Sequence, residues 1–279
     1  MKKKSVFFAA LLMLAACSSD NMEEQKSKVN LQSVIMTFSP YTMESMTRTV
    51  TSIAGIVTHL DVWLYENGNE VTAIHQSSGD IGFGSVAVTL DKTKTYTLYA
   101  VAHKCTDNAT LTNGIIAFPD DKVTHSMFYT TTFSPFTTTS LSCEMQRIVA
   151  QFRLETTDEV PSVCKKVQFT IGNVFDRWHV QNGGTHSIDK QHNVNITSTA
   201  SDGTVAINIF SITTDAQTLH DISVDALDKD DNVVQSRTFA NVPLRNGYKT
   251  TYHGSFFTDT TMEMMFTIDD WNEYDTIEF

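Results

Sequence analysis

The chain has 279 residues, of which 41% are hydrophobic, and a formal net charge of -12. This length is enough for one large or two modest domains, each able to bury a core. The excess of acidic residues, with no cluster of Lys and Arg that could neutralise phosphates, argues against binding to nucleic acid.

Residues 1–16 have the pattern of a secretory signal peptide. Three lysines at positions 2–4 precede an apolar run that extends to Ala16, as in the n- and h-regions of such signals. The run is shorter than the about 20 residues of a transmembrane helix. Its end, Leu14-Ala15-Ala16-Cys17, resembles the bacterial lipobox, in which the cysteine becomes residue one and its thiol is acylated. We therefore expect Cys17 to anchor the mature chain in the lipid of a membrane; the alternative is a secreted protein with Cys17 there by chance.

Residues 17–28 are polar and charged and predict a flexible tether. The acidic residues Asp20, Glu23 and Glu24 lie just behind the acylated cysteine. In some outer-membrane lipoproteins such an acidic patch directs the protein to the cell surface. A solvated linker is the alternative explanation.

Three cysteines besides Cys17 remain in the mature chain, namely Cys105, Cys143 and Cys164. The sequence permits one disulfide and requires none. No CxxC or CxxxH pair is present, so we expect buried free thiols rather than a zinc site, and no cofactor.

From residue 29 onward apolar residues alternate with polar ones, which is typical of half-buried β-strands. The dipeptide Asn67-Gly68 predicts a two-residue hairpin turn, and residues 91–94 predict a second turn. No segment has a helical pattern of convincing length. The apolar faces of the predicted strands are formed by Leu60, Val62 and Leu64; Val86, Val88 and Leu90; Tyr96, Leu98, Ala100 and Ala102; Ile148, Ala150, Phe152 and Leu154; Val167, Phe169 and Ile171; Val205, Ile207 and Ile209; Ile222, Val224 and Ala226; and Met264, Phe266 and Ile268.

Many short strands joined by turns predict an all-β protein built of antiparallel sandwiches of about 100 residues each. The mature length favours two in tandem, an N-terminal sandwich domain over residues 29–143 and a C-terminal one over residues 144–279. The Thr- and Ser-rich stretch at residues 133–143 is the expected junction. No internal repeat is evident.

Residues 225–232 contain the first part of a calcium-loop pattern, in Asp228, Asp230 and Asn232. The template requires Gly and Glu where this chain has Val233 and Phe239. We therefore expect a polar hairpin tip.

Three histidines, His179, His186 and His192, fall in a stretch around Gly183 and Gly184 that is predicted to be a loop. Their spacing fits no known metal-ligand pair, so no metal site is expected. The adjoining segment from Phe175 to Trp178 either stacks on a sugar ring or caps the end of a strand.

No catalytic motif is present: the sequence contains no GxSxG, no Cys beside a suitable His and no phosphate-binding glycine loop. Acidic residues are spread along the chain, so no carboxylate pair stands out for acid–base catalysis. We predict that the protein is not an enzyme.

Over its whole mature length the sequence resembles the fimbrillins, lipoprotein pilins of outer-membrane bacteria that build type V pili. The likeness depends on the order and spacing of short segments, of which the lipobox alone counts as a motif. The other segments are Thr47-Arg48-Thr49, the strand from Leu60 to Tyr65 with Asn67-Gly68, the strand from Tyr96 to Ala102, Met145 to Ala150, and Val242 to Tyr248.

The resemblance implies two transthyretin-like β-sandwich domains and a role for Arg48. In stalk fimbrillins an arginine-specific protease cuts at this place and removes the acylated segment with the first strand, here residues 30–38. A strand of a neighbouring subunit then fills the vacated groove by β-augmentation. The donor would be residues 263–279, with the polymerisation residues Met264, Phe266, Ile268, Trp271 and Phe279.

The sequence-based hypothesis is a structural subunit of an outer-membrane fimbria that supports cell adhesion on the bacterial surface. Its partners would be other fimbrial subunits, outer-membrane lipid through Cys17, and a host or bacterial surface ligand. Stalk, tip and anchor positions all stay open. The alternative is a surface glycan-binding lipoprotein that uses Trp63, Trp178 or Tyr65 as an aromatic platform.

Overall fold

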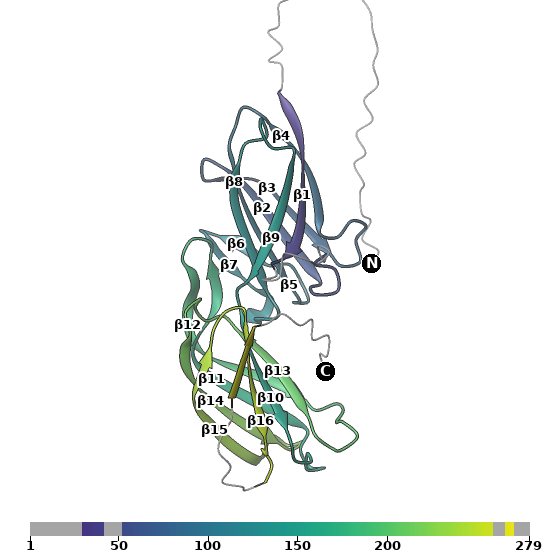
Figure 1. The fold of residues 1–279 in the computed structure, drawn as a ribbon, viewed down its shortest axis with the longest axis vertical. Coiled ribbons are helices and arrows are strands. Elements are labelled where there is room, and N and C mark those ends of the chain that lie inside the picture. Colours follow the sequence, from purple (N-terminus) through teal and green to yellow (C-terminus); the bar gives the residue numbers. More distant parts are fainter. Residues whose placement is uncertain (1–29, 42–51, 259–265, 271–279) are drawn as a thin grey trace, which may run out of the picture.

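The computed structural model describes residues 30–41, 52–258 and 266–270, and these residues form two β-sandwiches stacked along the long axis of the molecule (Figure 1). Within these ranges every regular element is a strand apart from one short 3-10 helix, η1 (Pro119–Asp121). The predicted all-β sandwich class is therefore confirmed. Within the described ranges, no helix has the length and apolarity needed to cross a bilayer.

The first sandwich is a seven-stranded sheet with the order β3-β2-β5-β8-β9-β1-β4. Strands β8 and β9 pair only at Met127↔Arg147 and Phe128↔Gln146, so the sheet folds over there and encloses a core between two layers. The strands are β1 (Leu31–Pro40), β2 (His59–Glu66), β3 (Asn69–Ser77), β4 (Ser85–Asp91), β5 (Tyr96–His103), β8 (Met127–Phe133) and β9 (Ser140–Arg147).

The second sandwich has a four-stranded sheet, β13-β10-β16-β17, which faces a six-strand sheet, β15-β14-β11-β7-β6, with β12 paired to β11 off that path. Its core has a ring cluster of Phe152, Phe169, Phe239 and Tyr252. The strands are β10 (Ala150–Thr156), β11 (Lys166–His179), β12 (Gly183–Asn195), β13 (Ala206–Ser211), β14 (Thr218–Leu227), β15 (Val233–Leu244), β16 (Tyr248–Gly254) and β17 (Phe266–Asp270).

Both sandwiches have the same connectivity. The first strand of each, β1 or β10, pairs in parallel with the seventh, β9 or β16, and antiparallel with the fourth, β4 or β13. The opposite layer reads β3-β2-β5-β8 in one sandwich and β12-β11-β14-β15 in the other. The chain therefore contains a structural repeat. The repeat is not evident in the sequence, because alternating apolar residues suffice to form each strand and no particular sequence has to recur.

The first sandwich carries an insertion between β5 and β8 that has no counterpart in the second. It contains β6 (Thr110–Thr112), β7 (Ile115–Ala117) and η1, and β7 pairs with the end of β11 from Arg177 to His179. A third apolar core fills the space between the two sandwiches and includes Trp63, Ile116, Phe128 and Trp178. The two halves are thus joined by both backbone pairing and side-chain packing.

The predicted apolar faces from Leu60 to Ala226 are buried, and Asn67 and Gly68 have the left-handed φ values of 50° and 81° that the predicted hairpin turn requires. Strand β9 spans the domain boundary expected between Cys143 and Glu144. We propose that the junction lies at Ile148–Val149, between β9 and β10, because both Cys143 and Met145 pack in the first core.

His125 lies at the contact between the sandwiches. Its ring stacks on Phe210 of β13 at 6.0 Å, and Arg147 donates from Nε to its Nε2 at 3.1 Å. Burial, together with the nearby charges of Arg147 and Lys104, lowers the pKa of His125 to about 3. The imidazole is therefore held neutral in the folded protein.

We expect the free energy of unfolding to fall on acidification below pH 6.5. The unfolded state binds a proton at His125 near pH 6.5, whereas the folded state does so only near pH 3, so acid favours unfolding over this window. The contribution is roughly 1.5 kcal/mol between pH 6.5 and pH 5. Denaturant titrations at both pH values should show a smaller pH dependence for His125→Asn than for the unsubstituted chain; equal dependence would contradict this account.

Candidate functional site

Strand β1 is an inner strand whose two neighbours are distant in sequence. It pairs antiparallel with β4 from Leu31↔Asp91 to Thr37↔Ser85 and in parallel with β9 from Ile35↔Ser140 to Pro40↔Met145. Further backbone bonds continue these ladders at both ends, such as Lys92 N–H to the Asn30 carbonyl at 2.8 Å. Removing β1 would leave unpaired N–H and C=O groups on both β4 and β9.

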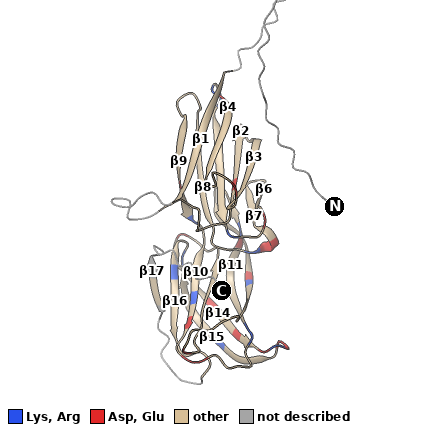
Figure 2. Cartoon of the chain, turned by 90° about the vertical axis from the view of Figure 1, so that its right-hand side faces the viewer, with Lys and Arg blue, Asp and Glu red and all other residues tan. Residues whose placement is uncertain are grey.

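The side chains of β1 alternate between the core and the surface. Val34, Met36 and Phe38 are at most 1% exposed and belong to the first core, whereas Leu31 and Ile35 are about half exposed. Burial of three such side chains contributes roughly 5–9 kcal/mol. No residue of β1 carries a charge, and few charged residues lie on the strands around it (Figure 2). The strand thus fills three apolar pockets in an uncharged groove between β4 and β9. We call this groove the seat of β1.

The predicted donor segment contains β17, which lies on the free edge of β16. Its pairing runs antiparallel from Tyr248↔Asp270 to Tyr252↔Phe266, and Ile268 is 43% exposed. Among the described residues β17 has one strand partner whereas β1 has two. Five residues singled out from the sequence, namely Cys17, Arg48, Met264, Trp271 and Phe279, lie outside the described residues.

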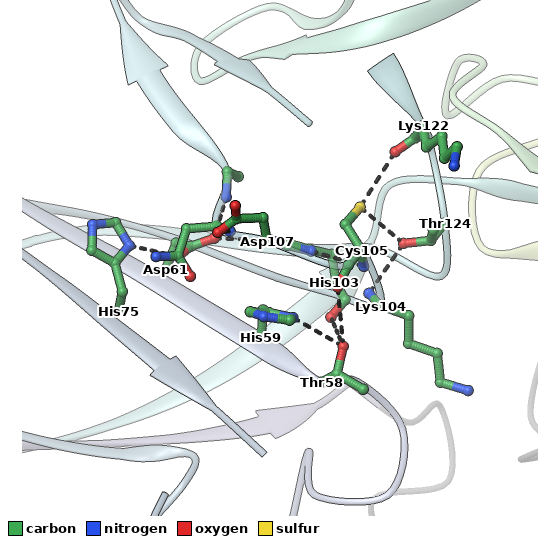
Figure 3. A network of polar contacts seen from close by, with 12 residues as sticks. Thr58, His59, Asp61, His75, His103, Lys104, Cys105, Asp107, Lys122 and Thr124 are labelled. Atoms are coloured by element: carbon green, nitrogen blue, oxygen red, sulfur yellow. Dashed lines mark hydrogen bonds and ion pairs between the residues drawn. The ribbon is translucent and has the colours of Figure 1, made fainter. Parts of the chain in front are cut away.

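A buried polar network holds the insertion onto the first sandwich (Figure 3). The Asp61 carboxylate, with no exposed side-chain surface, contacts His75 Nδ1 at 2.6 Å and His103 Nε2 at 2.8 Å, and it accepts the Ala109 N–H at 2.8 Å. The Cys105 N–H donates to His103 Nδ1 at 3.2 Å. Ala109 and Cys105 belong to the loop after β5, so their bonds to Asp61 and His103 pin that loop to β2 and β5, and the network is structural.

This network was not found from the sequence. The signal was a single aspartate between Leu60 and Val62 in an otherwise apolar strand. Alternation places Asp61 on the outer face of β2, where an ordinary surface carboxylate would also be expected. Only the insertion, which covers that face, turns it into a buried group.

The prediction of an aromatic platform for glycan binding is wrong for two of its three residues. Trp63 and Trp178 are 3% and 8% exposed and pack in the core between the sandwiches, so neither offers a surface to a sugar. The segment from Phe175 to Trp178 is part of strand β11. Tyr65 is half-buried and keeps one side open to solvent.

The three histidines expected in one loop belong instead to the β11–β12 hairpin. His186 Nδ1 lies 2.7 Å from Asp176 Oδ1, and burial with the charge of Lys190 lowers the pKa of His192 to about 4. Over residues 30–41, 52–258 and 266–270, no three His, Cys, Asp or Glu side chains gather as metal ligands would.

The loop after β14 is the expected polar hairpin tip, because Asp228 Oδ1 accepts the backbone N–H groups of Asp230 and Asn232. Cys105, Cys143 and Cys164 are buried free thiols. Burial raises the pKa of Cys143 to about 12, so this thiol stays protonated and unreactive.

Comparison with known proteins places the chain in a family. A family of unknown function, DUF6562, matches residues 64–277. The chain belongs to this family. No curated protein matches it.

The fold of this DUF6562 chain is similar to several solved structures. They include a candidate adhesin of Bacteroides thetaiotaomicron (12% identity, TM-score 0.53, 88% of this chain and 98% of that one). A candidate polysaccharide-binding protein of the same organism (11%, 0.53, 86% and 96%) and the fimbrial anchor protein Mfa2 of Porphyromonas gingivalis (11%, 0.50, 86% and 98%) are also similar. These likenesses confirm the predicted fimbrillin-like architecture at the level of the fold.

The seat of β1 can be tested with two neighbouring residues. Met36→Ala removes a fully buried side chain and should lower the free energy of unfolding by about 2–5 kcal/mol. Ile35→Ala, a matched control on the exposed face of the same strand, should cost less than about 1 kcal/mol. Urea titrations measure both. Equal losses would show that β1 does not fill the core in the manner described.

Proposed function

We propose that this protein is a structural, non-enzymatic subunit of an outer-membrane fimbria, exported as a lipoprotein through Cys17, and that it supports cell adhesion on the bacterial surface. The observation that carries the proposal is the place of β1, an amino-terminal strand inserted between β4 and β9. The fold shared with a fimbrial anchor protein and with a candidate adhesin supports the same assignment.

Assembly would proceed by exchange of β1 for a strand of a neighbouring subunit. Arg48 follows β1 in the sequence, so cleavage after it would free β1 from the rest of the chain while leaving the strand in its seat. A strand that pairs with both β4 and β9 and fills the same pockets can then replace it. The new strand restores both hydrogen-bond ladders, which makes the subunit contact nearly as complete as the original fold.

The carboxyl-terminal segment fits the donor role by its spacing. Val34, Met36 and Phe38 occupy the three pockets at intervals of two residues, and Met264, Phe266 and Ile268 follow the same interval. In the described part of the chain β17 pairs with one strand, β16, so detaching it breaks one ladder rather than two. Trp271 and Phe279 would add aromatic anchors beyond the ladder.

Treatment of the purified protein with an arginine-specific protease should start polymerisation. We expect intact-mass analysis to show a cut after Arg48, and electrophoresis without boiling to show a ladder of oligomers. Arg48→Ala should stay monomeric under the same treatment. Arg245→Ala, which removes an exposed arginine of the second sandwich, should polymerise as the unsubstituted chain does.

A chain truncated after residue 262 separates the two halves of the exchange. After cleavage it should accept a strand but donate none, so it should form no oligomers alone and should cap the polymers of the full-length protein. A protein that is cut after Arg48 yet stays monomeric, or that polymerises equally well as Arg48→Ala, would contradict the proposal.

A further inference from the structure

A cleft of about 480 Å³ lies where the first sandwich meets the long β11–β12 hairpin. Its floor is the outer face of β2 and β5, with Tyr65, Thr97 and Tyr99. Its walls are two turns, one at Asn113 after β6 and one at His179 and Gln181 after β11. The volume falls within the about 300–1,000 Å³ that small-molecule sites occupy.

The two tyrosines form an aromatic floor. Their ring centroids are 5.6 Å apart with an interplanar angle of 71°, and both rings pack on the core between the sandwiches. Both remain half-buried, so part of each ring faces the cleft. Burial and the nearby Glu70 carboxylate raise the pKa of Tyr65, so its hydroxyl stays protonated. The floor is therefore rigid, neutral and amphipathic.

The two wall turns are fixed to one another. The Val180 N–H donates to the Gly114 carbonyl at 2.9 Å. Gly114 has φ +77°, a left-handed conformation that glycine adopts without strain, and it lies against the His179 ring. The cleft is thus pre-formed by two segments that are far apart in the sequence.

The polar groups of the cleft are directional and uncharged. His179 Nδ1 accepts the N–H groups of Gln181 and Asn182 at 3.2 and 3.3 Å, so the ring proton lies on Nε2, beside Gly114. Asn113 and Gln181 supply amide groups and Thr97 a hydroxyl. Among the residues that the structure describes, no Asp, Glu, Lys or Arg lines the cleft.

We propose that this cleft binds a neutral saccharide. Aromatic rings suit the apolar C–H face of a sugar ring, and amide, imidazole and hydroxyl groups suit its hydroxyls. An anionic ligand would find no cation here, and the chain as a whole carries a net charge of -12. The site goes beyond the proposed fimbrial role, and none of its residues lies on β1, β9 or β17.

The full-length protein should be screened on an array of neutral gluco-, galacto- and manno-oligosaccharides beside sialylated and sulfated ones. We expect binding to neutral glycans only. Calorimetry with the best neutral oligosaccharide should then show an affinity loss of about tenfold or more for Tyr99→Ala. Phe136→Ala, which removes an aromatic ring that is 75% exposed on the β8–β9 loop, is the matched control and should bind normally.

Three further measurements keep the test decisive if Tyr99→Ala does not fold. Tyr99→Phe keeps the ring and should bind, whereas Gln181→Ala, on an exposed turn, should weaken binding and leave thermal stability unchanged. Hydrogen exchange should slow at residues 111–114 and 179–181 when the oligosaccharide is added. Absence of neutral-glycan binding, preference for anionic glycans, or full affinity in a folded Tyr99→Ala or Gln181→Ala variant would overturn the proposal. None of these results depends on polymerisation.

Discussion

The double hydrogen-bond ladder of β1 is the constraint on which the rest of the first sandwich depends. An edge strand can leave a sheet and expose one row of backbone groups. In contrast, β1 lies between β4 and β9 and forms hydrogen bonds with the backbone groups of both strands. It also supplies three buried side chains to the core. A cut in the segment that follows β1 would therefore break its covalent link to the rest of the sandwich, while β1 stays bound between β4 and β9. That combination suits a strand that protects a fold during export and is exchanged later, which is the role we propose for it.

The contact between the sandwiches has a different physical basis. The β6–β7 insertion pairs with β11, Asp61 fixes the insertion to β2, and an apolar core that includes Trp63 and Trp178 fills the remaining space. Two sandwiches joined by pairing, packing and a buried carboxylate form one body rather than two domains on a hinge. Such a body would carry tension along its length, which suits the fibre subunit that we propose. The β6–β7 and β11–β12 turns, which meet at this contact, also form the cleft beside Tyr65 and Tyr99.

Alternation of apolar residues was enough to predict the all-β class and most core faces, because each strand buries one side and the period of two is local. It was not enough to predict pairing. The parallel contact of β1 with β9 and the common connectivity of the two sandwiches join residues far apart in the chain, and many sequences satisfy the same alternation. The burial of Trp178 is not predictable from its own segment, because the β6–β7 hairpin that covers it comes from the other half of the chain. The glycines at 183 and 184 predict a loop around the histidines because glycine is frequent in turns, yet β12 begins at Gly183 and includes His186 and His192.

Hydrogen exchange can show whether β1 is replaceable by the carboxyl-terminal strand of another copy. The chain truncated after residue 262 should be cut at Arg48, and a synthetic peptide of residues 263–279 should then be added. We expect β1 to be displaced, the amides of β4 and β9 to remain protected, and the peptide's own amides to become protected. Continued occupancy of the seat by β1, with an unprotected peptide, would contradict this expectation.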